Sequence, residues 1–145
     1  MTFEEYEAEW AKDCELNQQE LTREALRIPN LHSKWTAYLN RERRMLHTHR
    51  KEVQELEYAL EGYFSRTLTM QEMDKYGFGE LPDKKTLKPD MARAIGSHPK
   101  MMDRKLRLGQ QQDKVDYLVD IIRAIHGRGF LIRDAIEWAK FQAGG

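Results

Sequence analysis

Residues 41–52, RERRMLHTHRKE, place five arginines and lysines and two histidines close together, although the formal net charge of the 145-residue chain is zero. Three kinds of chemistry use such side chains. Guanidinium and ammonium groups bind phosphates, imidazoles bind metal ions, and mixed charges solvate one face of a helix. The spacing of the residues distinguishes among these interpretations.

The cations of this run have a spacing that favours an elongated polyanion. On a helix, Arg43, His47 and Arg50 project to one side because they are three or four residues apart. Arg44 and Lys51 lie beside them. At about 6 Å per turn, such a ladder of cations matches successive phosphates of a flexible single strand.

A second basic stretch repeats the pattern later in the chain, where Lys100, Arg104 and Arg107 recur at helical spacing. Tyr38 and Tyr58 offer ring faces for base stacking near the first run. The predicted nucleic-acid-binding residues are Arg41, Arg43, Arg44, His47, Arg50, Lys51, Lys84, Lys85, Lys88, Lys100, Arg104, Lys105 and Arg107. A solvated face whose cations pair with acids of neighbouring segments explains the same pattern, so both interpretations stay open.

A metal site is not expected. Two residues separate His47 and His49 by about 200° around a helix, so they point to opposite sides and do not share an ion. Cys14 and His32, the nearest further ligand types, follow no recognised metal-binding spacing. We therefore expect no metal and no cofactor.

Catalytic motifs are missing from the sequence. It contains no G-x-S-x-G, H-E-x-x-H or Walker A motif, and no G-x-G-x-x-G ahead of a helix. The carboxylates fall on predicted exposed faces, without an apolar pocket to raise a pKa. We expect no catalytic residues and no enzyme.

The elements that position these residues are helices. Thr2 and Glu5 form a capping box, which predicts a short acidic helix over about 3–13. Asn17 starts a similar signature and predicts a second helix that Pro29 ends. Because no strand pattern with turn chemistry is present, we expect an all-α fold.

A long helix is predicted over about 31–67, where apolar residues recur at threes, fours and their sums. Only Glu42 and His49 interrupt this stripe. At about 1.5 Å per residue the helix would be about 55 Å long, whereas a compact chain of this length is about 38 Å across. We therefore expect an elongated protomer in which other copies of the chain bury the stripe.

The remainder of the chain is predicted as an irregular connection over 68–97, with a short helix at about 90–95, because glycines and prolines recur there. A helix restarts near residue 98 and ends in a glycine-rich C-cap at His126-Gly127-Arg128-Gly129. A last helix is predicted over about 130–142.

The sequence predicts one helical domain over 1–145, with acidic N-terminal helices over 1–28 and C-terminal oligomerisation helices over 98–145. The predicted oligomer interface consists of Trp35, Leu39, Leu46, Val53, Leu56, Leu60, Phe130, Trp138 and Phe141.

Charge alternates along the chain in blocks. The net charge is −5 over residues 1–30, +5 over 31–51, −6 over 52–83 and +6 over 84–114. Opposite blocks either form solvated helix faces or meet within one chain or between copies, which leaves surplus basic charge for a ligand. Both interpretations fit.

Composition points to a soluble intracellular protein. Charged residues make up 33% of the chain, and 18 uncharged apolar residues never run together, so no membrane span is expected. The acidic opening MTFEEYEAEW is not that of a signal peptide. Cys14 is the single cysteine, which excludes a disulfide within the chain.

Several stretches together resemble a known family. The opening FEEYEAEWAKD, the segment LHSKW at 31–35 and the stretch IHGRGFLIRDAIEWAKFQAG at 125–144 are similar to the bacteriophage recombination mediator family typified by UvsY. The similarity runs in order over nearly the whole length. Its strongest pieces are Ser33-Lys34-Trp35 and Arg128-Gly129-Phe130.

The resemblance implies a small helical protein that assembles into a hexameric or heptameric ring. It implies binding to single-stranded DNA and help in loading a RecA-like recombinase onto strands coated by single-strand-binding protein, without catalysis. It further implies that the C-terminal region forms the ring and that the protein acts in the cytoplasm of an infected bacterial cell.

One departure from the family pattern bears on DNA binding. Where the family has a basic pair in an L-K-A-R-L context, this chain has LEYAL, with Glu57 and Ala59 at the basic positions. The expected DNA contacts therefore come from the run at 41–51 and the basic residues of 84–107. The alternative function is a helical homo-oligomeric assembly or adaptor protein without nucleic-acid binding.

Overall fold

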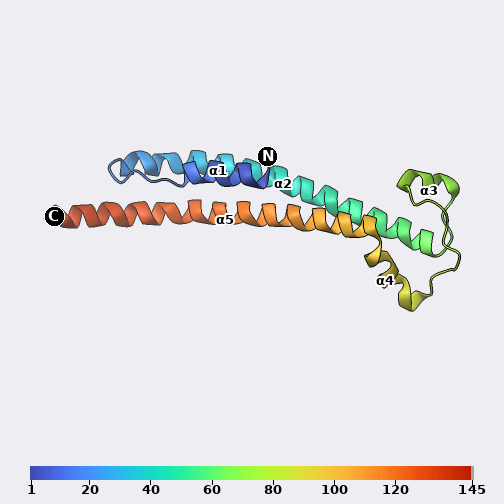
Figure 1. Ribbon diagram of the computed structural model, residues 1–145. Coiled ribbons are helices and arrows are strands. Elements are labelled where there is room, and N and C mark those ends of the chain that lie inside the picture. Colours follow the sequence, from blue (N-terminus) through green and yellow to red (C-terminus); the bar gives the residue numbers. More distant parts are fainter. Residues whose placement is uncertain (145) are drawn as a thin grey trace. The chain divides into compact units, whose positions relative to one another are not determined.

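The computed structural model describes residues 1–144, which form five helices and no strand (Figure 1). The predicted all-α class is confirmed. The helices are α1 (Phe3–Asp13), α2 (Leu21–Phe64), α3 (Met70–Tyr76), α4 (Lys88–Ser97) and α5 (Pro99–Gln142). None of the helices within residues 1–144 has the length and apolar character needed to cross a membrane.

The chain divides into two compact units. Unit 1 comprises Met1–Arg43 and Asp113–Gly145, and unit 2 comprises Arg44–Gln112. The long helices α2 and α5 each contribute a segment to both units. Each unit has its own buried side chains, so each is described in turn.

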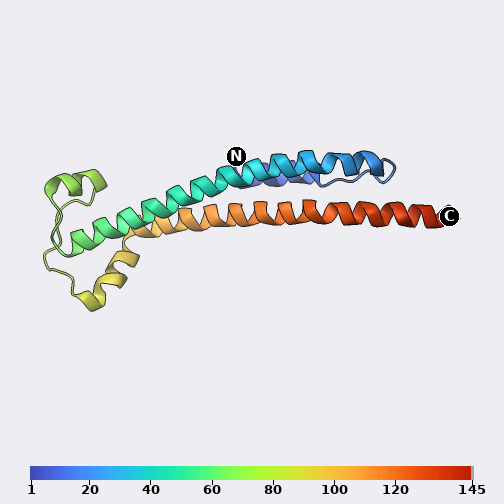
Figure 2. The ribbon, with the colours of Figure 1, turned by 180° about the vertical axis from the view of Figure 1, so that it is seen from behind.

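In unit 1, α1 packs along the first part of α2, as Figures 1 and 2 show from opposite sides. The predicted capping box is confirmed, because the Thr2 side chain accepts from the Glu5 backbone N–H and the Glu5 carboxylate accepts from the Thr2 N–H. Tyr6 is fully buried, and its ring lies 6.2 Å from that of Trp35. The aromatic spacing of α1 thus faces the core.

The unit 1 core combines three helices. Leu31, Trp35 and Leu39 are the buried residues of α2, and they follow the predicted stripe. The buried apolar residues of α5 in this unit are Val115, Leu118, Ile121, Ile125 and Ile132. Their spacing of three or four residues places them on one side of α5, where they stabilise the unit by excluding water from apolar area.

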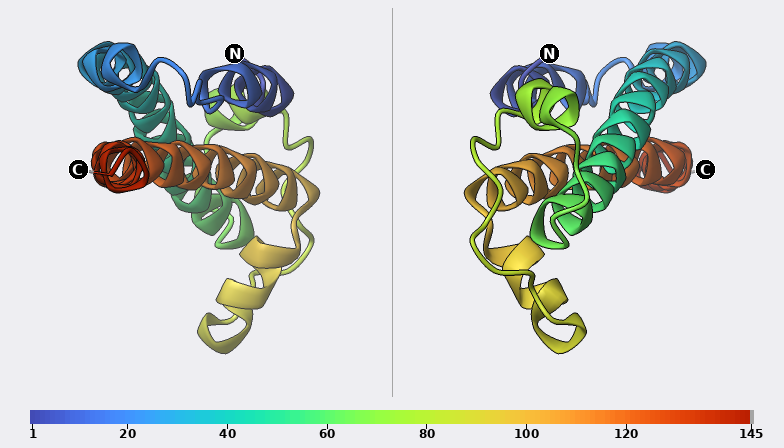
Figure 3. Two further views of the ribbon diagram at one scale, coloured as in Figure 1. Left: turned by 90° about the vertical axis from the view of Figure 1, so that its left-hand side faces the viewer. Right: turned by 90° about the vertical axis from the view of Figure 1, so that its right-hand side faces the viewer.

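The start of α2 differs from the prediction. Asn17 does not cap a helix; its side chain accepts from the Gln19 N–H within the loop that joins α1 to α2, visible in Figure 3. The helix begins at Leu21 and continues through Pro29 to Phe64. An interior proline costs a helix about 3 kcal/mol, and tertiary contacts on both sides of Pro29 offset this cost.

Buried ionic contacts of Arg128 supply part of that compensation on the N-terminal side of the proline. The Arg128 guanidinium, on α5, donates to the backbone carbonyls of Asp13 and Glu15. It also lies 3.3 Å from the carboxylate of Glu24, and both side chains are buried. Arg27 contacts the same carboxylate at 3.1 Å. These contacts fasten the end of α1 and the first turns of α2 to α5.

Lys34 and Trp35 hold α1 on the other side of the proline. The Lys34 ammonium lies 2.6 Å from the Asp13 carboxylate and 2.8 Å from that of Glu9. The Trp35 indole N–H donates to the same Asp13 carboxylate at 2.9 Å. Burial works to lower the pKa of Lys34, but hydrogen bonds to Asp13 and Glu9 outweigh it and raise that pKa.

Glu42, one of the two polar interruptions of the stripe, is also part of the unit 1 core. Its carboxylate accepts a hydrogen bond from the Tyr6 hydroxyl at 2.8 Å and lies 3.7 Å from the Lys114 ammonium. Burial, together with the bond to Glu42, raises the pKa of Tyr6, so the phenol keeps its proton and donates it to this bond. The interruption therefore has a structural explanation.

In unit 2, the last part of α2 and the first part of α5 pack together with α3 and α4 (Figure 2). The core consists of Val53, Leu56, Leu60 and Met101, with Tyr63, Phe64, Tyr76, Phe78, Ile95 and Leu108 against it. Burial and the nearby Lys100 lower the pKa of His98, whose ring lies 5.7 Å from that of Phe78.

The connection between the long helices contains more structure than predicted. The short helix expected at 90–95 is α4, but α3 was not anticipated. Thr69 caps α3 through its hydroxyl, and Gly77 ends it in the left-handed conformation at a φ of 65°. That φ is a conformation that glycine adopts readily.

The predicted break at Gly127 and Gly129 is wrong, because α5 runs unbroken from Pro99 to Gln142. Ile125, Arg128 and Ile132 are buried on one face on both sides of the glycines. Their packing holds the helix through a segment where glycine lowers its intrinsic stability. Local composition therefore did not decide where this helix ends.

The predicted subunit interface on α2 is also wrong. Trp35, Leu39, Leu46, Val53, Leu56 and Leu60 are all buried within the single chain. In unit 1 they are covered by α1 and α5, and in unit 2 by α5 and the connection. The prediction failed because it assumed a compact globule, whereas α5 has the same 44 residues as α2 and covers it in each unit.

The C-terminal part of the predicted interface has a different environment. Phe130, Trp138 and Phe141 are exposed, by 60%, 60% and 69%. The rings of Trp138 and Phe141 stack on each other with centroids 5.6 Å apart. These three residues are therefore available for contact with another copy, and that role remains a prediction.

Candidate nucleic-acid interface

The first basic run lies on α2, at the point where the helix passes from unit 1 to unit 2. Arg41 and Arg43 are exposed in the unit 1 segment, where Arg41 lies 5.9 Å from the centre of the Tyr38 ring. Tyr38 is itself bonded to the Glu9 carboxylate, which leaves its hydroxyl engaged. The cations of this segment point away from the unit 1 core.

In the unit 2 segment, Arg44, His47, Arg50 and Lys51 are all exposed. They fall within an arc of about 120° on α2, on the side away from the buried stripe. Arg50 donates to the Gln112 side chain at 3.0 Å. Within residues 1–144, the side chains of Arg44 and His47 make no hydrogen bond or ion pair, so they are open to an anionic ligand.

The two histidines lie in different surroundings. His47 is exposed, whereas His49 is half-buried with Nδ1 3.7 Å from the Glu52 carboxylate. In the part of the chain described, no group of three or more His, Cys, Asp or Glu side chains is placed to hold a metal ion.

Three cations of the second basic stretch converge on one hollow of unit 2, with a volume of about 500 Å³. We call it the basic hollow. Its lining consists of Leu56, Lys75, Tyr76, Pro99, Lys100, Asp103, Arg104 and Arg107. The structure thus brings Lys100, Arg104 and Arg107 together, as their spacing predicts, and adds Lys75 from α3.

Hydrogen bonds orient the cations of the basic hollow. The Lys100 ammonium donates to the backbone carbonyl of Tyr76 at 2.7 Å, which ties α5 to the end of α3. Arg104 donates to the Glu52 carboxylate at 2.7 Å. Arg107 lies 3.2 Å from the carboxylate of Asp103. Each cation is held by one partner and keeps further N–H donors for a ligand.

The other predicted cations lie elsewhere in unit 2. Lys84 and Lys85 are exposed in the connection between α3 and α4, and Lys88 begins α4. Lys105 lines a separate hollow that also includes Ile95. The structure does not place these four lysines in the basic hollow.

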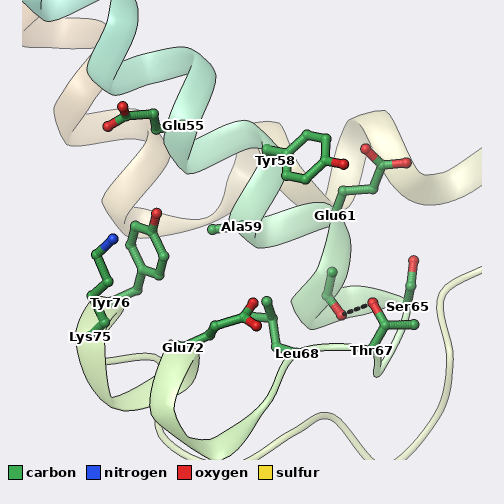
Figure 4. A pocket seen from close by; sticks show the side chains of 11 residues that line it. Glu55, Tyr58, Ala59, Glu61, Ser65, Thr67, Leu68, Glu72, Lys75 and Tyr76 are labelled. Carbon is green, nitrogen blue, oxygen red and sulfur yellow. Dashed lines mark hydrogen bonds between the residues drawn. The ribbon is translucent and has the colours of Figure 1, made fainter.

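A third hollow of unit 2, of about 560 Å³, is acidic (Figure 4). Carboxylates of Glu55, Glu61 and Glu72 line it together with Tyr58 and Tyr76. It adjoins the LEYAL segment, where the family pattern has basic residues. The acidic character of this surface supports the expectation that DNA contacts lie elsewhere on the chain.

The family model described as "Recombination, repair and ssDNA binding protein UvsY" matches residues 9–145. The chain belongs to the UvsY family. The description of the family names recombination, repair and binding of single-stranded DNA. No curated protein sequence matches the chain.

Crystal structures of the bacteriophage T4 recombination mediator protein UvsY share the fold of this UvsY family member. The structure in lattice type II matches with a TM-score of 0.86 and 20% identity, over 99% of this chain and 98% of that chain. The structure in lattice type IV matches with a TM-score of 0.85 and 18% identity, over 97% and 99%.

The motifs that resemble the UvsY family have structural roles in this chain. Lys34 and Trp35 bind Asp13 at the end of α1, and Arg128 binds the adjoining loop and Glu24. The similarity therefore reflects how unit 1 is held together. Lys75 and Tyr76 were missed by sequence reasoning, because nothing in the sequence around them predicted α3.

Proposed function

We propose that this protein is a non-enzymatic recombination mediator that binds single-stranded DNA. It helps to load a RecA-like recombinase onto strands coated by single-strand-binding protein, in the cytoplasm of an infected bacterial cell. The observation that carries this proposal is the family match over residues 9–145.

The distribution of charge supports DNA binding. Exposed cations on α2 and at the start of α5 give unit 2 surfaces on which phosphates meet guanidinium and ammonium groups. Two of them, Arg44 and His47, have no side-chain partner in the described chain. Contacts of this kind bind without reading sequence, as loading onto arbitrary strands requires.

Assembly into a hexameric or heptameric ring is part of the same proposal. Phe130, Trp138 and Phe141 leave a large aromatic surface exposed at the end of α5. A head-to-tail contact between copies covers such a patch and closes into a ring when the rotation permits. Mass in solution by light scattering tests this: a monomer at all concentrations would exclude the ring.

Salt-dependent binding tests the DNA-binding part. The purified protein should bind a labelled oligothymidylate, with log affinity falling against log salt by about 0.7 per phosphate neutralised. Exchanging Arg43 and Arg44 for Glu should weaken binding while the oligomer stays intact. Absence of binding by the wild-type protein at low salt would refute the function.

The same exchange separates this function from that of an adaptor without DNA binding. If the basic run serves subunit contacts alone, Arg43→Glu with Arg44→Glu dissociates the oligomer and the wild-type protein shows no DNA affinity. Recombinase loading is tested by adding the protein to strands coated with single-strand-binding protein and following recombinase filament formation.

A further inference from the structure

We infer that the basic hollow of unit 2 binds a nucleotide of the single strand, with its phosphate among the cations and its base against the ring of Tyr76. This inference rests on the proposed function and assigns Lys75 and Tyr76, which the basic runs of the sequence do not include, to DNA binding. The basic hollow has room for such a group, since its volume of about 500 Å³ is typical of small-ligand sites.

The charge of the lining favours a phosphate. Four cations, Lys75, Lys100, Arg104 and Arg107, face one carboxylate, Asp103. Within residues 1–144, the Lys75 ammonium has no carboxylate at ion-pair distance; it lies 5.4 Å from the centre of the Tyr76 ring. The hollow therefore holds excess positive charge that the described chain does not neutralise.

The cations are also pre-oriented. Arg104 is held by Glu52 and Lys100 by the Tyr76 carbonyl, each at 2.7 Å. A ligand that meets fixed donors loses less side-chain entropy on binding than one that must order them. Since each of these groups uses one donor internally, the remaining N–H groups are available for phosphate oxygens.

Tyr76 provides a fixed aromatic surface beside these cations. Phe78 stacks on it with ring centroids 5.3 Å apart and an angle of 14° between the planes. One ring face is thereby covered, and Tyr76 is half-buried at the border between the basic and the acidic hollow. A base reaches such a ring only when it is unpaired, so this contact selects single strands over duplex.

The cations are tested by loss of two charges. Lys75→Gln with Arg107→Gln removes two exposed cations of the hollow, and Arg93→Gln with Arg123→Gln removes two exposed cations outside it. The hollow variant should lower the salt slope for a labelled oligothymidylate by about 1.4, that is about 0.7 per phosphate contact. The control variant should leave it unchanged.

The ring is tested by Tyr76→Leu and Tyr76→Phe. Leucine keeps apolar volume without stacking, so single-strand affinity should fall by about 5-fold or more while duplex affinity stays the same. Phenylalanine keeps the ring and should retain affinity. Helix content by circular dichroism identifies a leucine variant that fails to fold, in which case the charge variant decides.

The outcomes separate this inference from the function on which it rests. If the wild-type protein binds oligothymidylate and the Lys75/Arg107 variant behaves like its control, the hollow is not the site, and the proposed function stands. If the wild-type protein does not bind at all, the proposed function itself is wrong, and the inference is overturned with it.

Discussion

Replacement of Arg128 by alanine should destabilise unit 1 more than any surface substitution. Arg128 is 6% exposed and contacts three acceptors, the carbonyls of Asp13 and Glu15 and the carboxylate of Glu24. Removing one partner of a buried ion pair costs about 3–5 kcal/mol. Because Arg27 still neutralises Glu24 at 3.1 Å, we expect the lower end, a loss of about 3 kcal/mol in the free energy of unfolding.

The loss is measured by urea unfolding followed by far-UV circular dichroism. Thermal unfolding should show the same effect as a drop in Tm of roughly 6–12 °C, at about 2–4 °C per kcal/mol for a chain of this size. Both proteins are compared at equal concentration, since self-association adds to apparent stability.

Arg123 provides the matched control on the same helix. Its side chain is 76% exposed and pairs with Asp120 across one turn, so Arg123→Ala should change stability by no more than about 0.5 kcal/mol. An Arg128→Ala protein within about 1 kcal/mol of this control would refute the view that buried ionic contacts hold α1 and α2 to α5.

Three further substitutions test the fold. Gly127→Ala should stabilise the protein by about 1 kcal/mol in urea unfolding, because α5 is helical there and no atom lies within 4 Å of the added Cβ; a destabilisation would mean the helix ends at this glycine. Burial lowers the pKa of His98, so the unfolded state binds more protons and stability should fall as pH drops through about 6.5. His98→Gln should remove this pH dependence and His47→Gln should retain it, and equal profiles would contradict the assignment. Tyr6→Phe should cost about 1–2 kcal/mol by leaving buried Glu42 without its hydroxyl donor, and an unchanged urea midpoint would show that this bond contributes nothing.

Part of the candidate site was predictable from sequence. Charge spacing identified Lys100, Arg104 and Arg107 as one group, because residues three and four apart share a helix face wherever that helix lies. Lys75 and Tyr76 were not predictable, because they reach the hollow only through the position of α3. That position depends on the Lys100 bond to the Tyr76 carbonyl and on packing around Phe78.

The sequence by itself determined the helical class, the capped start of α1 at Thr2 and the set of residues that face inward. These features depend on neighbours within a few positions along the chain, so periodicity and capping chemistry suffice to predict them. The inward residues of α2 from Trp35 to Leu60 are indeed all buried.

The tertiary structure alone decided where the long helices end and what covers them. Pro29 and Gly127 predict breaks locally, yet Arg128, Trp35 and Ile132 make contacts on both sides of these residues that hold the helices through them. Whether a stripe meets its own chain or another copy depends on residues roughly a hundred positions away, such as Arg128 and Glu24. Sequence periodicity describes a face, and only packing between distant segments supplies its partner.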